Sequence, residues 1–373
     1  MEIHGNLTIE RSNFTNIIGG TGEYFSGAVA MPGYYNNAFI SECQFINITG
    51  GTGSAIYFNE GNISVSKSIF MNNNNTMGTV YLGNVSSGYV NYNIFLNNTC
   101  HKSYDGKDLF IMYAFSNVNA DFNFWNNNSQ PTAEEIDNVE KVSYWTILEL
   151  SAENYNVFLG STPTITAKFI ATNGTENITL DDMMPEFSFD LSASSGTIEP
   201  VTVTVVNNVA SAIYTPETTG TVTITASPGT AELIIDVVDL GTIIAVSADG
   251  SDETGIGTLD SPYATIAHAL SQVTETRNII YILKSENPYK EHDLTLSGNV
   301  IIKSEDETVT IDGENAGRIF TVTGNATIED LNLINGQSSE NGGAIYVNGG
   351  NLTVKNVKFS NSAATNGGAI FMD

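Results

Sequence analysis

The clearest repeat in the chain is AIYVNGGNLTVKNVKFSNSAATNGGAIF, residues 344–371. Three short runs in it, separated by Gly and Asn, have an apolar residue at every second position: Ile345/Val347, Leu352/Val354 and Val357/Phe359. Such alternation is typical of strands that are buried on one face. The pattern restarts at Gly367 after about 25 residues, which predicts one coil of a parallel β-helix with three strands per coil. Because a single coil cannot bury its own inward face, we expect a stack of coils.

The same order of parts recurs in residues 54–83, and one register runs through both regions. An apolar anchor, usually Phe, is followed two places later by Asn. The pairs are Phe14/Asn16, Phe45/Asn47, Phe70/Asn72, Phe95/Asn97, Phe124/Asn126, Leu333/Asn335 and Phe359/Asn361. We predict that the anchors, with Phe45, Phe70 and Phe95 in one column, fill the core. Beside them, the asparagines would form a structural ladder in tight turns, where Asn tolerates the left-handed conformation and bonds to the amide one coil away.

The composition limits the classes of function. The chain has 373 residues, enough for two or three domains. Thirteen basic and 41 acidic residues give a net charge of −28, which opposes binding to nucleic acid or anionic membranes, since both need Lys and Arg to neutralise phosphate. No apolar run is long enough to span a membrane. Cys43 and Cys100 lie about two coils apart, so we expect free thiols.

The residue pattern changes along the chain, and these changes predict three domains. Residues 1–131 read as the C-terminal coils of a parallel β-helix, and an acidic linker is expected over 132–141. Thr/Val alternation with frequent turn signals predicts a β-sandwich without a disulfide over 142–239. Residues 240–373 would form the N-terminal cap and first coils of a second β-helix. Its cap is a short helix that we expect to open at Ser261-Pro262 and to end near Glu275.

Several stretches resemble the adhesin-like cell-surface proteins of methanogenic archaea: VSADGSDETGIGTLDSPYATIAHAL (246–270), the GGAIYVNGG coil, FNFWNNNSQP (122–131) and SSGTIEP with ASAIYTPETTGTVTITA. The resemblance covers nearly the whole chain. It implies right-handed, pectate-lyase-like β-helices that alternate with bacterial-Ig-like domains of the invasin type, in an extracellular, cell-surface location. The chain opens inside one coil and stops inside another, which predicts a fragment whose signal and anchor lie outside it. In that family the segment after the coils usually has Trp-Trp-Gly or Tyr-Trp-Gly, whereas this chain has Phe124-Trp125-Asn126.

Enzymes are an alternative, because the same fold is found in pectate lyases, pectin esterases and polygalacturonases. Elimination on a uronate polymer needs an Arg or Lys base, and hydrolysis needs paired carboxylates. The three arginines fall in three separate places: Arg11, Arg277 and Arg318. We therefore expect no enzyme activity and no cofactor. The alternative remains a lyase or esterase relative whose catalytic coils lie outside this fragment.

A Gly-rich loop before the expected helix holds Asp249, Asp252 and Glu253. Carboxylates with flexible backbone between them are suited to calcium, so Asp249 and Asp252 are a candidate calcium site. Their spacing does not match an Asp-x-Asp-x-Asp-Gly loop, however, and a capping turn is the favoured interpretation.

A candidate binding ladder comes from the other face of the first strand of each coil. If the Ile and Val positions point inward, alternation sends an aromatic residue outward from several coils: Tyr57, Tyr81, Phe110, Tyr346 and Phe371. Rings about 5 Å apart would form a stripe that binds glycans or a partner protein. Cross-coil stacking that merely stabilises the sheet is an equal alternative.

The sequence thus predicts a cell-surface, adhesin-like fragment that acts as a rigid stalk and binds glycans or surface proteins of another cell. A purely structural spacer is the third possibility.

Overall fold

The computed structural model describes residues 5–20, 27–33, 36–101, 107–112, 117–126, 128–137, 139–228 and 231–373. Strands dominate it, and parallel β-solenoids account for many of them, so the predicted all-β class is confirmed. The chain forms two compact units. The first comprises 1–155, 162–217 and 221–235, and the second comprises 156–161, 218–220 and 236–373. Each unit is described by itself.

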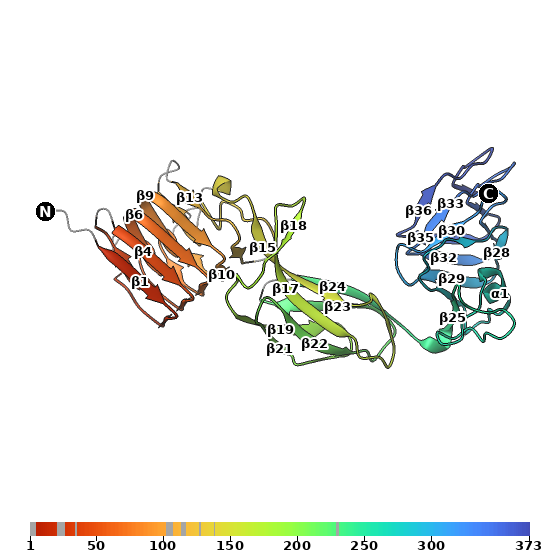
Figure 1. Cartoon of the computed structure of the whole chain (residues 1–373), viewed down its shortest axis with the longest axis horizontal. Coiled ribbons are helices and arrows are strands. Elements are labelled where there is room, and N and C mark those ends of the chain that lie inside the picture. Colours follow the sequence, from red (N-terminus) through yellow and green to blue (C-terminus); the bar gives the residue numbers. More distant parts are fainter. Residues whose placement is uncertain are drawn as a thin grey trace. The chain divides into compact units, whose positions relative to one another are not determined.

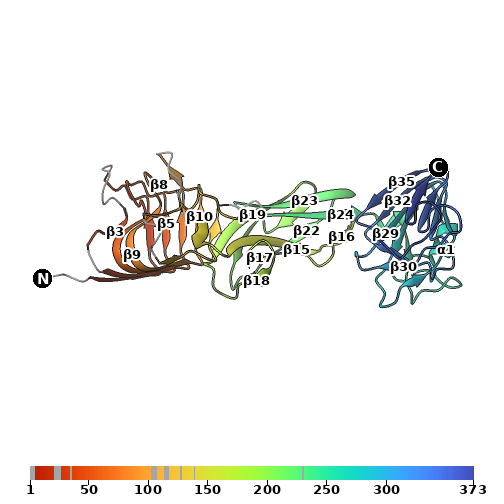
Figure 2. The same cartoon turned by 90° about the horizontal axis from the view of Figure 1, so that it is seen from above.

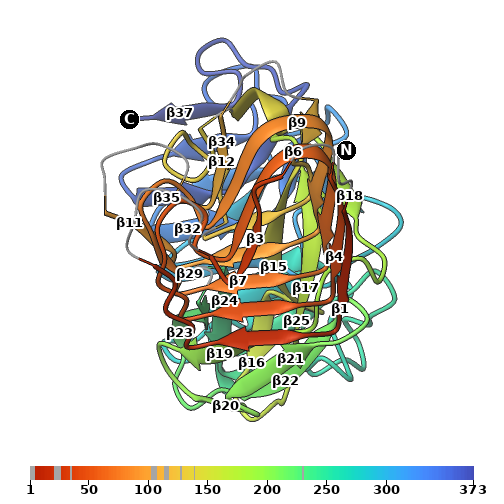
Figure 3. The ribbon, with the colours of Figure 1, turned by 90° about the vertical axis from the view of Figure 1, so that its left-hand side faces the viewer.

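In the first unit, the strands of a solenoid form three sheets, and strands of successive turns pair in parallel (Figure 1, Figure 2). One sheet holds β1 (Asn6–Glu10), β3 (Val29–Met31), β4 (Asn36–Ser41), β6 (Ile56–Ser66), β9 (Val80–Asn91), β12 (Leu109–Ile111) and β13 (Val118–Asn119). A second holds β2 (Asn13–Thr15), β5 (Gln44–Ile46), β7 (Ile69–Met71), β10 (Ile94–Leu96) and β14 (Phe124–Trp125). The short strands β8 (Asn74–Asn75) and β11 (Thr99–Cys100) pair with each other. Figure 3 looks along this stack from the side of β1.

The predicted Phe column fills the core of this solenoid. Phe45, Phe70 and Phe95 are fully buried, and their rings stack with centroids 5.0 and 4.8 Å apart. Phe14 extends the column below Phe45 at 4.7 Å. Residues 25 positions apart therefore occupy equivalent places in successive turns, which confirms the predicted register.

The prediction that Phe124 is an anchor of the core column is wrong. Trp125 pairs with Phe95 and continues the column, with ring centroids 4.9 Å apart. Phe124 instead packs edge-on against Phe169 at 5.7 Å. The turn that follows Trp125 is one residue shorter than the others, because Asn126 comes directly after the stacked ring.

Two antiparallel sheets follow the first solenoid. One holds β15 (Trp145–Ala152), β17 (Thr164–Thr172), β18 (Asn177–Thr179), β20 (Thr197–Glu199) and β22 (Ala210–Thr215). The other holds β19 (Phe187–Ala193), β21 (Thr202–Val205), β23 (Gly220–Ser227) and β24 (Ala231–Val238), with β16 (Asn156–Phe158) parallel to the end of β24. Alternate residues of both sheets are buried, as the Thr/Val alternation predicts.

The solenoid continues into the first of these sheets without a break in pairing. Phe124 in β14 pairs with Thr146 in β15, and the Thr146 amide donates to the carbonyl of Asn123 at 2.9 Å. The hydroxyl of Thr146, which is fully buried, donates to the carbonyl of Phe122 at 2.9 Å. One hydrogen-bonded sheet therefore runs from β2 through β14 and β15 to β20.

The segment expected to be a linker is packed against the last solenoid turn. Ile136 is fully buried and pairs with Leu109, and Glu135 is buried beside Lys107 with a 3.3 Å ion pair. The linker prediction is therefore wrong, because it used the polarity of residues 132–141 and overlooked one apolar residue that completes a turn. The 3-10 helix η1 (Val139–Lys141) ends the segment.

The second unit contains the other solenoid, again with three parallel sheets. The first holds β25 (Ile243–Val246), β26 (Ile279–Ile282), β29 (Asn299–Ser304), β32 (Asn325–Glu329) and β35 (Asn351–Lys355). The second holds β27 (Tyr289–Lys290), β30 (Thr310–Asp312), β33 (Asn332–Ile334) and β36 (Lys358–Ser360). The third holds β28 (Leu294–Leu296), β31 (Phe320–Val322), β34 (Ile345–Val347) and β37 (Ile370–Met372). The coil at 344–371 thus supplies β34, β35, β36 and part of β37.

The helix before these coils is shorter than expected. It is α1 (Ile266–Ser271), and its N-cap is Thr265, whose hydroxyl accepts from the His268 amide at 3.1 Å. Ser261-Pro262 lies outside the helix, because Ser261 pairs with Thr258 in a tight turn. Ile266 and Ala269 are fully buried against the solenoid core.

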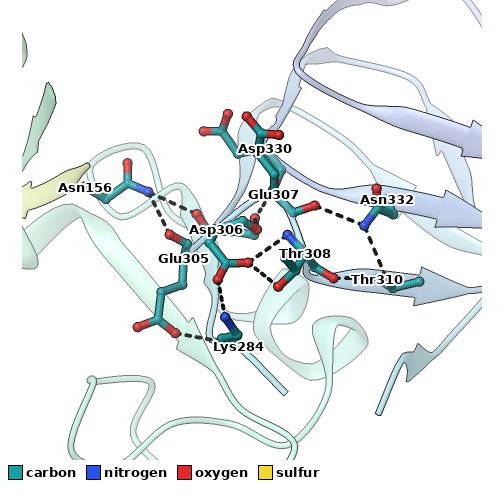
Figure 4. A network of polar contacts seen from close by, with 10 residues as sticks. Asn156, Lys284, Glu305, Asp306, Glu307, Thr308, Thr310, Asp330 and Asn332 are labelled. Atoms are coloured by element: carbon teal, nitrogen blue, oxygen red, sulfur yellow. Dashed lines mark hydrogen bonds and ion pairs between the residues drawn. The ribbon is translucent and has the colours of Figure 1, made fainter. Parts of the chain in front are cut away.

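Polar contacts bind the start of β16 to a loop of this solenoid (Figure 4). The Asn156 amide donates to the carbonyls of Ser304 and Glu305 at 3.2 and 3.3 Å. The Lys303 ammonium, buried to 3% exposure, lies 2.6 Å from a carboxylate oxygen of Asp236 and 3.4 Å from one of Glu329. Burial would lower the pKa of Lys303, but these carboxylates more than offset it and raise the pKa. The short 3-10 helix η2 (Leu240–Thr242) follows β24.

Candidate functional site

In the first solenoid the rings of the candidate binding ladder stack, but they are not exposed. Tyr57, Tyr81 and Phe110 are paired in successive turns, with centroids 5.0 and 5.5 Å apart and nearly parallel planes. Tyr57 and Tyr81 keep only 6% and 5% of their surface exposed. The expectation of an open stripe is therefore wrong for these two residues. Alternation reports which side of a strand a residue faces, and it does not report what covers that side.

The stacking itself has a further consequence for ligand binding. A sugar ring binds an aromatic side chain through the flat face of the aromatic ring. In a column with nearly parallel planes about 5 Å apart, each face is covered by the next ring. Such a ladder offers ring edges to a ligand and no faces between its ends.

In the second solenoid the ladder is short and tilted. The Tyr346 and Phe371 rings are half-buried, with centroids 6.1 Å apart and planes at 43°. The residue at the equivalent position of the preceding turn is Thr321, which has no ring. The Arg318 guanidinium lies 5.0 Å from the Tyr346 ring centre, and the Tyr346 hydroxyl donates to Asp373 at 2.9 Å. The five predicted ladder residues thus fall into two separate groups.

All residues of the predicted Asn ladder adopt the left-handed conformation, with φ between 52° and 56°: Asn16, Asn47, Asn72, Asn97, Asn126, Asn335 and Asn361. Amide contacts between turns are present at some of them. The Asn47 amide donates to Asn16 Oδ1 at 3.3 Å, and the Asn97 backbone N–H donates to Asn126 Oδ1 at 2.9 Å. These asparagines therefore form the turns of the solenoid and are not a binding site.

Two buried ladders of Asn side-chain amides were not predicted from the sequence. Asn73 and Asn98 follow the left-handed asparagines and point inward, where each side chain serves the backbone of the turn before it. The Asn73 oxygen accepts from the Ile48 N–H at 3.0 Å, and the Asn98 oxygen accepts from the Asn73 N–H at 2.9 Å. At the preceding bend, Asn93 and Asn123 act in the same way on Ser68 and Asn93. The repeated Asn-Asn dipeptides, 25 residues apart, are the sequence pattern from which these ladders could have been predicted.

A buried carboxyl lies beside one of these ladders. Asp108 is 1% exposed, and its Oδ1 accepts from the Asn98 amide at 2.8 Å, while its Oδ2 has no hydrogen-bond partner among the residues that the structure describes. Burial raises the pKa of Asp108 to about 7, against the opposing effects of the Asn98 hydrogen bond and the Lys107 charge. The nearby Glu135 carboxylate adds to the rise.

The loop considered for calcium is organised as a capping turn. Asp252 Oδ1 accepts from the backbone N–H groups of Ala264 and Thr265 at 2.8 and 3.1 Å, and its Oδ2 accepts from the Thr265 hydroxyl at 2.7 Å. Burial alone would raise the pKa of Asp252, but these hydrogen bonds together more than offset it and lower the pKa. In the ranges that the structure describes, His, Cys, Asp and Glu side chains nowhere gather in threes in a way that could hold a metal. Asp249 and Asp252 thus gain no support as a calcium site. Cys43 and Cys100 are free thiols, as expected.

An exposed aromatic pair on the first solenoid is a candidate that the sequence analysis missed. Phe39 in β4 is 41% exposed and Tyr89 in β9 is 56% exposed, on the outward face of the sheet. The alternation around Phe39 carries the signal, because Ala38 and Ile40 are both buried and send Phe39 outward.

No helix in the described part of the chain combines the length and the apolar character that crossing a membrane requires. Comparison of the chain with models of protein families, with curated proteins and with solved structures finds no match in any of the three.

Proposed function

We propose that this chain is a rigid stalk segment of an extracellular, adhesin-like surface protein of the archaeal kind that its sequence resembles. The observation that carries the proposal is the unbroken sheet from β10 through β14 into β15. Load along such a sheet passes through successive backbone hydrogen bonds, with no free linker between the solenoid and the sandwich. The stacked column that ends in Trp125 reinforces the same junction.

The finer architecture belongs to this proposal. Two antiparallel sheets without a disulfide fit a bacterial-Ig-like domain. The helix α1 packs its Ile266 and Ala269 onto the core next to β25 and so fits the role of a cap for the second solenoid. The proposal includes no catalytic step.

Rigidity is tested by spin labels in the full chain, within the first unit. In a Cys43→Ala, Cys100→Ser background, labels replace two exposed residues, Asn84 in β9 and Glu232 in β24. We expect one narrow distribution of label distances in electron–electron double resonance. The matched variant Thr146→Pro removes the N–H that bonds Asn123 across the junction and is expected to broaden that distribution. A broad distribution without this substitution would refute the stalk.

The surface location has its own test. Brief protease treatment of intact source cells should release peptides of this chain into the medium, as judged by mass spectrometry. A ribosomal protein serves as the control for lysis. Peptides that appear only after the cells are broken would contradict an extracellular role.

A further inference from the structure

The outward face of the sheet β1-β4-β6-β9 carries a row of paired positions that runs from turn to turn: Thr8, Phe39, Ser64, Tyr89 and Asn119. Phe39 and Tyr89 are its two large exposed side chains, with Ser64 between them. Since turns of a parallel stack are spaced by about 4.8 Å, these two residues are anchored about 10 Å apart. The small Ser64 side chain leaves the space between the two rings open.

The faces of these two rings are accessible, unlike those of the buried ladder. In the part of the chain that the structure describes, neither Phe39 nor Tyr89 stacks on another aromatic ring, whereas Tyr57 and Tyr81 cover each other. Both rings therefore leave apolar surface open to a ligand on the same face.

A row of amides lies beside the rings on the same face. Asn37 donates to Asn6 at 2.9 Å, and Asn62 donates to Asn37 at 3.0 Å. All three are exposed, and these bonds use one N–H of Asn37 and one of Asn62. Each of those two amides therefore keeps one N–H for an external acceptor.

This face is free of charge in its central turns. The accessible outward positions of the three central strands are Asn37 and Phe39 in β4, Asn62, Ser64 and Ser66 in β6, and Ser87, Tyr89 and Asn91 in β9. In a chain of net charge −28, these eight neighbouring positions are all neutral. A charged ligand would find no counter-charge there, and a polyanion would be repelled by the protein as a whole.

We propose that this face binds a neutral polysaccharide whose chain runs along the solenoid, across the strands. One sugar ring stacks on Phe39 and another stacks on Tyr89, while the free N–H groups of Asn37 and Asn62 donate to hydroxyl oxygens between them. A linear polymer suits the site because both the rings and the amides repeat along one axis. The proposal goes beyond the stalk and does not depend on its rigidity.

Affinity electrophoresis of the full chain in gels that contain a neutral polysaccharide tests the proposal, with soluble cellulose, xylan, mannan and chitin derivatives as probes. We expect retardation by at least one of them and none by polygalacturonate. The double variant Phe39→Ala, Tyr89→Ala should weaken that binding about tenfold or more, since each open ring contributes a stacking contact. Tyr155→Ala is the matched control, because Tyr155 is 59% exposed in the same unit and lies outside this face.

Circular dichroism and thermal melting should be the same for the double variant, the control and the wild type, since the changed rings are exposed. Absence of binding to every neutral glycan would overturn the proposal, as would equal binding by the double variant. Binding to cells that depends on both rings but persists after removal of neutral glycans would assign the face to a protein partner instead. None of these outcomes alters the label distances that test the stalk.

Discussion

Phe70→Ala is expected to lower the free energy of unfolding of the first unit by about 3–5 kcal/mol. Phe70 is fully buried, and it is the central ring of the column, with Phe45 on one face and Phe95 on the other. Removal of the ring leaves a cavity that the neighbours cannot fill, because their positions are fixed by the hydrogen bonds of their own turns. Two stacking contacts are lost at the same time.

Urea unfolding followed by hydrogen exchange of peptides from residues 56–98 measures this loss in the full chain and separates it from the second unit. Phe39→Ala is the control, since Phe39 lies in another sheet of the same solenoid and is 41% exposed, so that the same deletion should cost well under 1 kcal/mol. Similar losses in both variants would contradict the column as the main source of stability.

Asp108→Asn is expected to stabilise the first unit at pH 8 and to have little effect near pH 4. The carboxyl keeps its proton up to a pH of about 7 in the folded protein, against an ordinary pKa of 3.8. Between these values the unfolded chain has released a proton that the folded chain still holds, so stability falls as the pH rises. At about 1.4 kcal/mol per pH unit, the full cost above pH 7 is about 4 kcal/mol, and asparagine at this position avoids it.

Thermal melting of wild type and variant across pH 4–9 gives the comparison. Asp181→Asn, the same substitution in an exposed loop of the same unit, is the matched control. A constant difference between Asp108→Asn and wild type over this range would show that folding does not raise the pKa of Asp108.

The local turn geometry was predictable because it depends on short stretches of sequence. All seven asparagines placed two residues after an anchor are left-handed, because Asn tolerates that conformation better than most residues. The same rule predicted the positions of Phe45, Phe70 and Phe95. It failed at Phe124, where a shorter turn moves the core position by one residue to Trp125.

Exposure was not predictable in the same way, because it depends on segments that are distant in the sequence. Tyr57 and Phe39 both face away from the solenoid core, yet Tyr57 is 6% exposed and Phe39 is 41% exposed. The sequence pattern around the two residues is alike. The burial of Ile136 is a similar case, since only its contact with Leu109 distinguishes it from a residue of a polar linker.

The inward amide ladders also bear on the chemical durability of an asparagine-rich protein. Asparagine deamidates when the backbone nitrogen of the next residue attacks its side-chain carbonyl, which makes it one of the least durable residues. After Asn47 and Asn72, that nitrogen belongs to Ile48 and Asn73, and each donates its hydrogen to an amide oxygen one turn away, at 3.0 and 2.9 Å. A nitrogen held in this way is turned from the carbonyl it would attack. The contacts that hold successive turns together thus also slow the ageing of their own asparagines.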